Sequence, residues 1–279
     1  MRKTILLLII LLIGMLIPVG FSTSDNTMVI TYGETTYNNH DYKKTVDDFF
    51  KTQTGYEIKD IESKIITASE VNEVSSTITG KTYGENQIFS SALVDLNDNE
   101  NLKVSVDKSK ITTITGDMYI SSLKSVGITA GHVYVTSPVS ATGESALAGI
   151  MNSYEEATDV EIPDNVKKAA NKDIYTQAEI VKNSDVDADK LTKVVDDVKQ
   201  EVENKNITDH ETIVDVITNE TNNQNITLKN TDVEKLAKSI EEIQNVQTDI
   251  DSYQNEVSDV LNTTDANQTT GLFDILTQK

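Results

Sequence analysis

The hydrophobic pattern of the chain changes near residue 160. Before that point, short β-branched runs alternate with apolar residues at helical spacing, and after it only helical spacing remains. Interleaved strands and helices favour helices packed on a mixed sheet. The sequence therefore predicts an α+β protein, with a mixed α/β sandwich domain over residues 25–159 and an acidic all-α helical domain over residues 160–261.

Apolar runs and periodic segments locate the elements of the first domain. The polar run Asn97–Asn101 separates two of the runs and predicts a hairpin that joins them. Helices are predicted from spaced apolar residues over 42–50, 118–126 and 146–154. Strands are predicted over 28–32, 61–67, 88–96, 102–106 and 132–136.

The second domain is predicted to be a helical hairpin array or a small bundle. Its apolar stripes cover residues 166–181, 191–202, 213–217 and a long fourth stretch, 233–260. Thr208 with Glu211, and Thr231 with Glu234, have the spacing of capping boxes at two helix starts. The Asn-Ile-Thr triplets at Asn206 and Asn225 indicate a shared turn before these helices.

The N-terminus has the order of a secretory signal. Arg2 and Lys3 precede an apolar run, Ile5–Ile17, and small residues follow at 22–24. The run is shorter than the roughly 20 residues of a transmembrane helix. Residues 1–24 are therefore predicted to be a cleaved signal peptide, with a retained N-terminal anchor as the alternative. Either reading places the folded part outside the cytoplasm, secreted or tethered to the outer face of the membrane.

Charge and cysteine content exclude several classes of function. A net charge of −21 argues against nucleic acid as a partner and against docking of the folded part on anionic lipid. Without cysteine the chain has no disulfide, thiol nucleophile, zinc finger or iron–sulfur site. The expected partner is an unidentified envelope component or protein ligand, with membrane contact only through residues 1–24 if they are retained.

Asparagine sequons are frequent in the second half of the chain. In an exported protein they are candidate glycan acceptors, although a chain this rich in Asn and Thr also contains such triplets by chance. The sequons are at Asn206, Asn219, Asn225, Asn262 and Asn267.

Ser145 has part of the setting of a hydrolase nucleophile. It follows a predicted strand at a predicted helix start, but Leu147 occupies the position of the second glycine of a nucleophile elbow. The alternative is an ordinary helix N-terminus, with Thr142 as the cap and Glu144 in the first turn. We therefore assign no catalytic residue.

No metal or cofactor site is predicted. The acidic stretches 95–99 and 185–196 have part of the spacing of a calcium loop, but Lys190 stands where the second needs a glycine. Turn and N-cap roles explain both stretches. His40, His132 and His210 are scattered and lack the spacing of metal ligands.

The segment Val135–Ile150, followed by Tyr154 and Glu155, resembles the YpuA-like family of exported proteins of unknown function. The resemblance implies an exported or membrane-tethered protein of this architecture and no particular activity. Within the motif, small residues could fix the packing of a helix on the sheet, or the helix start could contact an anionic ligand. The residues concerned are Ser137, Pro138, Thr142, Gly143, Glu144, Ser145 and Gly149.

These observations favour an exported, envelope-associated protein that acts as a non-enzymatic binding or structural module. The alternative is a secreted hydrolase of envelope material that uses paired carboxylates as general acid and base. Residues 262–279 are predicted to be a flexible tail rich in Thr, Asn and Gln.

Overall fold

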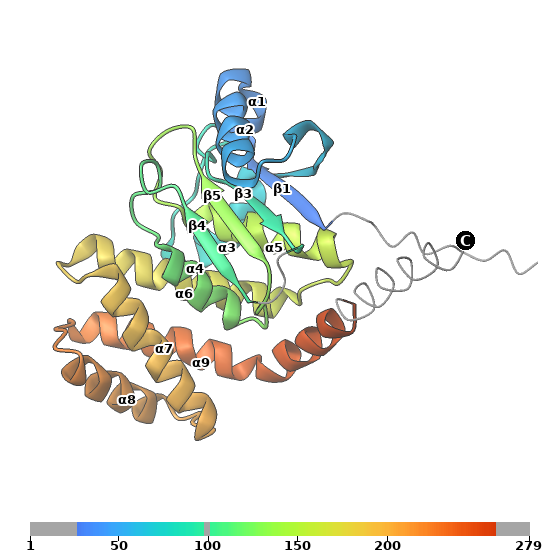
Figure 1. Cartoon of the computed structure of the whole chain (residues 1–279). Coiled ribbons are helices and arrows are strands. Elements are labelled where there is room, and N and C mark those ends of the chain that lie inside the picture. The colour runs from blue at the N-terminus through green and yellow to red at the C-terminus, as the bar shows by residue number, and fades with distance from the viewer. Residues whose placement is uncertain (1–26, 98–100, 261–279) are drawn as a thin grey trace, which may run out of the picture.

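The computed structural model describes residues 27–97 and 101–260 (Figure 1). The predicted signal segment, most of the predicted turn at 97–101, the C-terminal tail and the sequons Asn262 and Asn267 lie outside the described residues. Among the residues that are described, no helix is long and apolar enough to cross a membrane.

The centre of the molecule is a five-stranded mixed sheet with the order β2-β1-β3-β5-β4. β1 and β2 are parallel, as are β4 and β5, whereas β3 runs antiparallel to both of its neighbours. The strands are β1 (Met28–Gly33), β2 (Glu62–Ile66), β3 (Ser91–Asp95), β4 (Lys103–Val106) and β5 (His132–Thr136).

The predicted hairpin between β3 and β4 is wrong, because β5 lies between these two strands. β5 is apolar and almost wholly buried, whereas β4 is exposed to half-buried along its length. A buried strand gains most from a position with neighbours on both sides, and a polar strand is tolerated at an edge. β4 therefore forms the sheet edge and pairs with β5 alone.

Alternation along the strands divides the core between the two faces of the sheet. On β3, Ala92 and Val94 join the larger apolar cluster beneath the sheet, and Leu93 joins a smaller cluster on the opposite face. The smaller cluster includes Val46 and Phe50 of α2, which lies on that face (Figure 1). The larger cluster is covered by α4, α5 and α6.

Helices account for most of the remaining chain. The predicted α+β class with a mostly helical second half is confirmed. The helices are α1 (Glu34–Asn38), α2 (His40–Thr54), α3 (Ala68–Thr79), α4 (Gly116–Lys124), α5 (Glu144–Thr158), α6 (Asp164–Asn183), α7 (Ala188–Asn204), α8 (His210–Asn223) and α9 (Asn230–Asn245), together with the short 3₁₀ turn η1 (Ile58–Asp60).

α6 contributes to both of the large apolar clusters. Its residues from Val166 to Ala178 pack beneath the sheet, while Ile180 joins a second cluster formed with α7, α8 and α9. The predicted long helix over 233–260 is wrong in one respect, since α9 ends at Asn245 and a separate helix covers residues 247–260. Tyr253 of this last helix returns to the cluster beneath the sheet.

Both predicted capping boxes of the helical half are wrong. α8 is capped by Asp209, whose carboxylate accepts hydrogen bonds from Thr212 N and Thr212 Oγ1, and a negative charge is favourable at a helix N-terminus. α9 begins after Lys229 without a side-chain cap. Leu228 and Val233, at the positions of a hydrophobic staple, pack against the same apolar cluster and fix that helix start instead.

The predicted shared turn at the two Asn-Ile-Thr triplets is confirmed. Asn206 and Asn225 have positive φ angles of 50° and 54°. Ile207 N donates to Val202 O over 2.9 Å, and Ile226 N donates to Thr221 O over 2.8 Å. These are the 6→1 bonds of a Schellman motif, in which asparagine takes the left-handed position that glycine usually occupies.

A buried polar network joins α4, α6, α7 and α9. At its centre Asp173 of α6 is fully buried and pairs with Lys199 of α7, with 2.6 Å between Oδ2 and Nζ. Ser122 of α4 donates to the same carboxylate over 2.9 Å, and Lys199 also donates to Ser125 over 2.9 Å. The network therefore ties the helical half to the layer beneath the sheet.

Candidate functional site

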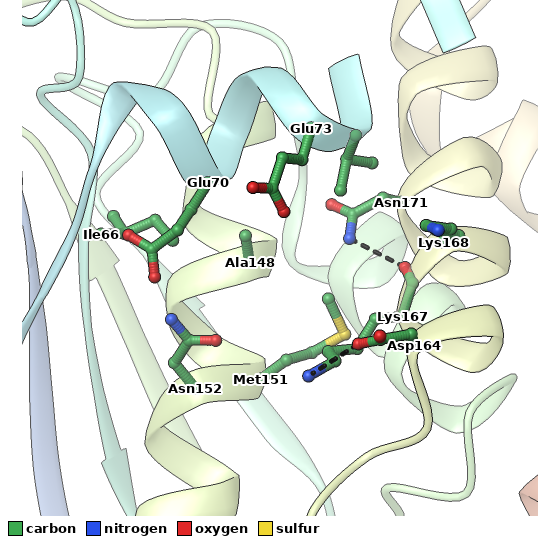
Figure 2. Close-up of a pocket in the computed structure, with 11 residues that line it drawn as sticks. Ile66, Glu70, Glu73, Ala148, Met151, Asn152, Asp164, Lys167, Lys168 and Asn171 are labelled. Carbon is green, nitrogen blue, oxygen red and sulfur yellow. Dashed lines mark hydrogen bonds and ion pairs between the residues drawn. The ribbon is translucent and has the colours of Figure 1, made fainter. Parts of the chain in front are cut away.

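A cavity of about 260 Å³ lies where α3, α5 and α6 meet (Figure 2). Its walls combine carboxylates, ammonium groups and amides with an apolar floor. The residues that line it are Ile66, Glu70, Glu73, Val74, Ala148, Met151, Asn152, Asp164, Lys167, Lys168 and Asn171.

The start of α3 positions the acidic wall of the cavity. Thr67 and Glu70 form a capping box, in which Thr67 Oγ1 accepts from Glu70 N and the Glu70 carboxylate accepts from Thr67 N over 2.8 Å. Val71 is buried beneath the helix and fixes its rotation. Glu73 lies one turn after Glu70 on the wall of the same cavity.

The two glutamates differ in whether their carboxylates already bond to other residues. The Glu70 carboxylate also accepts from Thr67 Oγ1 over 2.6 Å, so its role is to cap α3. Glu73 has no ion pair or side-chain hydrogen bond with any other residue that the structure describes. Figure 2 shows its carboxylate directed into the space between the three helices. Glu73 is therefore the acidic group that the cavity offers to a ligand.

The opposite wall belongs to the first turns of α6. Lys167 Nζ lies 3.0 Å from Glu155 Oε1 and 3.6 Å from Asp164 Oδ1. Burial lowers the pKa of Lys167, but the hydrogen bond and charge of Glu155, and then the charge of Asp164, outweigh burial and raise it. Lys167 is therefore charged and engaged within the protein. Asn171 is buried and donates from its amide to Lys167 O over 2.8 Å.

The rest of the lining is apolar or neutral. Ala148 and Met151 of α5 form the floor with Ile66, and Asn152 of α5 presents an amide beside them (Figure 2). An unengaged carboxylate above an apolar floor, with amides nearby, matches the usual composition of a small-molecule site. Such an arrangement fits a ligand that combines an ammonium group with a short apolar part.

None of the predicted motif residues lines this cavity. Ser137 and Pro138 are buried in the loop after β5, and the Ser137 hydroxyl makes no hydrogen bond with any described residue. Gly149 of α5 faces β1, where an added Cβ would lie 3.1 Å from Thr31 Cγ2. Close to this contact, Thr31 Oγ1 and Ser153 Oγ share a hydrogen bond of 2.7 Å. These contacts pack α5 against the sheet.

The predicted cap at Thr142 is wrong, because the N-cap of α5 is Gly143, in a left-handed conformation with φ of 107°. The chain turns there close to Ile111, in a space that only glycine fits. Thr142 instead donates its hydroxyl proton to the carboxylate of Glu144. Ser145 is half-buried in the first turn of α5.

Glu144 is buried among tyrosines. Burial and then the charge of Glu144 raise the pKa values of Tyr119 and Tyr83. The pKa of Tyr175 is raised mainly by burial, and further by the charges of Tyr83 and then Glu144. The Tyr119 hydroxyl donates to Gly143 O over 2.6 Å, which fixes the start of α5. A role of the motif in ligand contact stays a prediction.

The histidines lie in separate parts of the molecule. His132 on β5 lies 2.9 Å from Ser105 Oγ and 3.0 Å from the Tyr134 hydroxyl. His210 lies on α8, and its hydrogen bonds to Glu234 and then Glu241 of α9 raise its pKa. His40 is exposed at the start of α2.

The acidic stretches have turn and cap roles. Asp187 caps α7 by accepting from Lys190 N over 3.0 Å, and Asp95 accepts from Asn97 N over 2.9 Å. In the described part of the chain, no group of three or more His, Asp or Glu side chains could hold a metal ion.

Residues 32–260 match the family described as "Protein of unknown function (DUF1002)". The chain belongs to this family. A curated relative is the uncharacterised protein YpuA of Bacillus subtilis (strain 168), which is 26% identical over 147 residues, 52% of this chain and 49% of that protein. The chain thus spans about half the length of the curated relative that it matches. No solved structure matches.

The predicted resemblance to the YpuA-like family is confirmed, and the protein is an uncharacterised member of a family of unknown function. α3 was not predicted, and neither was the cavity that it helps to form. One signal was present, since Thr67-x-x-Glu70 precedes apolar residues at helical spacing, Val71, Val74 and Ile78. Lys168 and Asn171 are separated from Glu73 by about a third of the chain, so no local pattern places them together.

Proposed function

We propose that this protein is an exported, envelope-associated binding module without catalytic activity. The cavity between α3, α5 and α6 is its binding site for a small ligand that carries an ammonium group. The apolar run at 5–17 between basic and small residues supports export. The partner on this proposal is a component of the envelope, reached by the folded part outside the cytoplasm.

The observation that carries the binding proposal is the unengaged carboxylate of Glu73 above an apolar floor (Figure 2). Glu73 is exposed at the wall of the cavity. A hydrogen bond from an ammonium group to a carboxylate is stronger than one between neutral groups. Ala148 is half-buried and offers apolar contact to the same ligand, and Met151, which is 1% exposed, lies at the base of the cavity. Asn152 and Asn171 add amides that orient it.

The state of the other carboxylates favours binding over hydrolysis by paired acids. A glycosidase-type pair needs two carboxylates free to serve as acid and base or nucleophile. Here Glu70 is held in the capping box and Asp164 pairs with Lys167. Glu73 alone is unengaged among the acidic residues that line this cavity.

Replacing Glu73 by glutamine is expected to weaken the binding of L-alanine amide several-fold, because an ion pair with an exposed carboxylate contributes up to about 1 kcal/mol. Isothermal titration calorimetry on the chain from residue 25 onward would measure the change. The Glu203→Gln variant removes an equal charge from an exposed residue at the end of α7 and is expected to bind like the parent protein.

N-acetyl-L-alanine amide, which lacks the ammonium group, is the matched ligand control and is expected to bind much more weakly than L-alanine amide. Equal binding of the two compounds, or equal binding by the parent and Glu73→Gln proteins, would contradict an ammonium site at Glu73.

Export has a direct test in the source cell. Fractionation with peptide mapping is expected to find the protein outside the cytoplasm, with a mature N-terminus near Asp25. A retained N-terminus in the membrane fraction would support the anchored form instead. Recovery of the intact chain from the cytoplasm would refute export. Added mass on peptides containing Asn206, Asn219 or Asn225, which are exposed in the structure, would show glycosylation.

A further inference from the structure

We propose that a second cavity, between α3, α6 and α9, binds a phosphate group. It has a volume of about 440 Å³, and its charged lining consists of four lysines and two glutamates. The residues that line it are Thr77, Ile78, Lys168, Lys172, Thr176, Glu179, Lys235, Lys238 and Glu242. This site is separate from the proposed amine site, although Lys168 lines both cavities.

Two of the lysines are held in place by the two glutamates. Lys235 of α9 donates to Glu179 of α6 over 2.8 Å, and Lys172 of α6 donates to Glu242 of α9. These crossed ion pairs connect the same two helices in opposite directions. They fix the separation of α6 and α9 and keep both of these ammonium groups at the rim of the cavity.

The other two lysines have no such partner. Neither Lys168 nor Lys238 forms an ion pair with a carboxylate anywhere in the described part of the chain. The chain as a whole has a net charge of −21. Both lysines are exposed, and the lining of the cavity holds two more ammonium groups than carboxylates. An excess of positive charge attracts anions and raises their local concentration.

A threonine side chain without a protein partner supplies a second observation. Thr176 lines the cavity, its exposed fraction is 6%, and its hydroxyl makes no hydrogen bond with any described residue. Other threonines in helices of this chain donate their hydroxyl proton to a carbonyl oxygen of the preceding turn, as Thr158 does to Tyr154 O. A hydroxyl without a protein partner is free to donate to a ligand. Thr176 lines the same cavity as the lysines.

Phosphate fits this set of donors better than a carboxylate does. A phosphate monoester carries a charge of about −1.5 to −2 at neutral pH and a phosphodiester headgroup about −1, and both present strong acceptor oxygens. Lys168, Lys238 and the Thr176 hydroxyl provide separate donors for those oxygens. The cavity is also larger than one phosphate needs, so the phosphate would belong to a larger molecule, either a soluble phosphate ester or a lipid headgroup.

Calorimetric titration with glycerol 3-phosphate at low ionic strength tests the site. The double variant Lys168→Gln, Lys238→Gln is expected to bind at least tenfold more weakly than the parent protein. The matched double variant Lys182→Gln, Lys229→Gln removes two exposed lysines outside the cavity and is expected to bind within about twofold of the parent. Thr176→Val keeps the charge and the shape, and is expected to weaken binding several-fold.

Glycerol 3-phosphate binding is expected to be kept in Glu73→Gln, so this result is independent of the amine site. Sedimentation with phosphatidylglycerol vesicles, against phosphatidylcholine vesicles, distinguishes the two sources of phosphate. If the parent protein binds phosphatidylglycerol vesicles and the Lys168→Gln, Lys238→Gln protein does not, the phosphate belongs to a lipid headgroup. If the parent protein binds glycerol 3-phosphate but not the vesicles, the phosphate belongs to a soluble ester. Equal weakening by both double lysine variants, or no binding of glycerol 3-phosphate by the parent protein, would overturn the proposal.

Discussion

Replacing Asp173 by alanine is expected to lower the free energy of unfolding by about 3–5 kcal/mol, because it leaves a buried charge without its partner. The Asp173 side chain is fully buried, and that of Lys199 is 12% exposed. Besides the ion pair, Asp173 accepts hydrogen bonds from Ser122 over 2.9 Å and from Gln177 over 3.1 Å. Denaturant unfolding followed by circular dichroism would measure the loss.

Two matched variants separate this cause from a general loss of charge. Asp197→Ala breaks an exposed pair with Lys193 on α7, and is expected to cost less than about 1 kcal/mol. Replacing both Asp173 and Lys199, by leucine and methionine, is expected to restore much of the stability, since no unpaired charge then remains. A cost for Asp173→Ala no larger than that of Asp197→Ala would contradict the assigned role of the pair.

The second large effect is expected at the start of α5. Replacing Gly143 by alanine is expected to destabilise the protein by about 2–5 kcal/mol, through left-handed strain of about 1–2 kcal/mol and overpacking of about 1–3 kcal/mol. Gly143 has φ of 107°, and an added Cβ would lie 2.8 Å from Ile111 Cγ2 and 2.9 Å from the Tyr119 hydroxyl. The shift of the thermal midpoint, converted with the unfolding enthalpy, gives the measured value.

Gly55 supplies the control for the steric part of this effect. It ends α2 with φ of 75°, and an added Cβ there meets no described atom within 4 Å. Gly55→Ala therefore adds the left-handed strain without the collision, and is expected to cost about 1 kcal/mol. If Gly143→Ala and Gly55→Ala cost the same, the close packing of Gly143 against Ile111 and Tyr119 has no energetic weight.

The sequence predicted those elements whose residues are close together in the chain. The β-branched runs at 28–32 and 132–136 form β1 and β5, and Gly55 caps α2 in the left-handed conformation that its position implies. The strand order could not be predicted in this way. Neighbouring runs joined by a polar turn favour a hairpin, but burial placed β5 between β3 and β4.

The cavities depend on contacts between distant segments. Glu73 and Asn171 line one cavity only because α3 packs beside α6, and Lys168 and Lys238 line another only because α9 packs against α6. Periodicity identifies which face of a helix is buried, but not which helix it meets. The motif at 137–149 combines glycines with polar residues, and its contacts at Gly143 and Gly149 pack α5 against its neighbours. The domain boundary at residue 159 stays a prediction.

The most direct test of the binding claim uses the methionine methyl groups. Met151 lines the cavity of Figure 2, whereas Met118, equally buried in the core beneath the sheet, does not line it. With ¹³C-labelled methionine methyl groups, L-alanine amide is expected to shift the Met151 resonance in a saturable way and to leave Met118 in place. The shift is expected to need higher ligand concentrations in Glu73→Gln. A Met151 resonance that does not move while calorimetry detects binding would place the ligand elsewhere and contradict the proposed site.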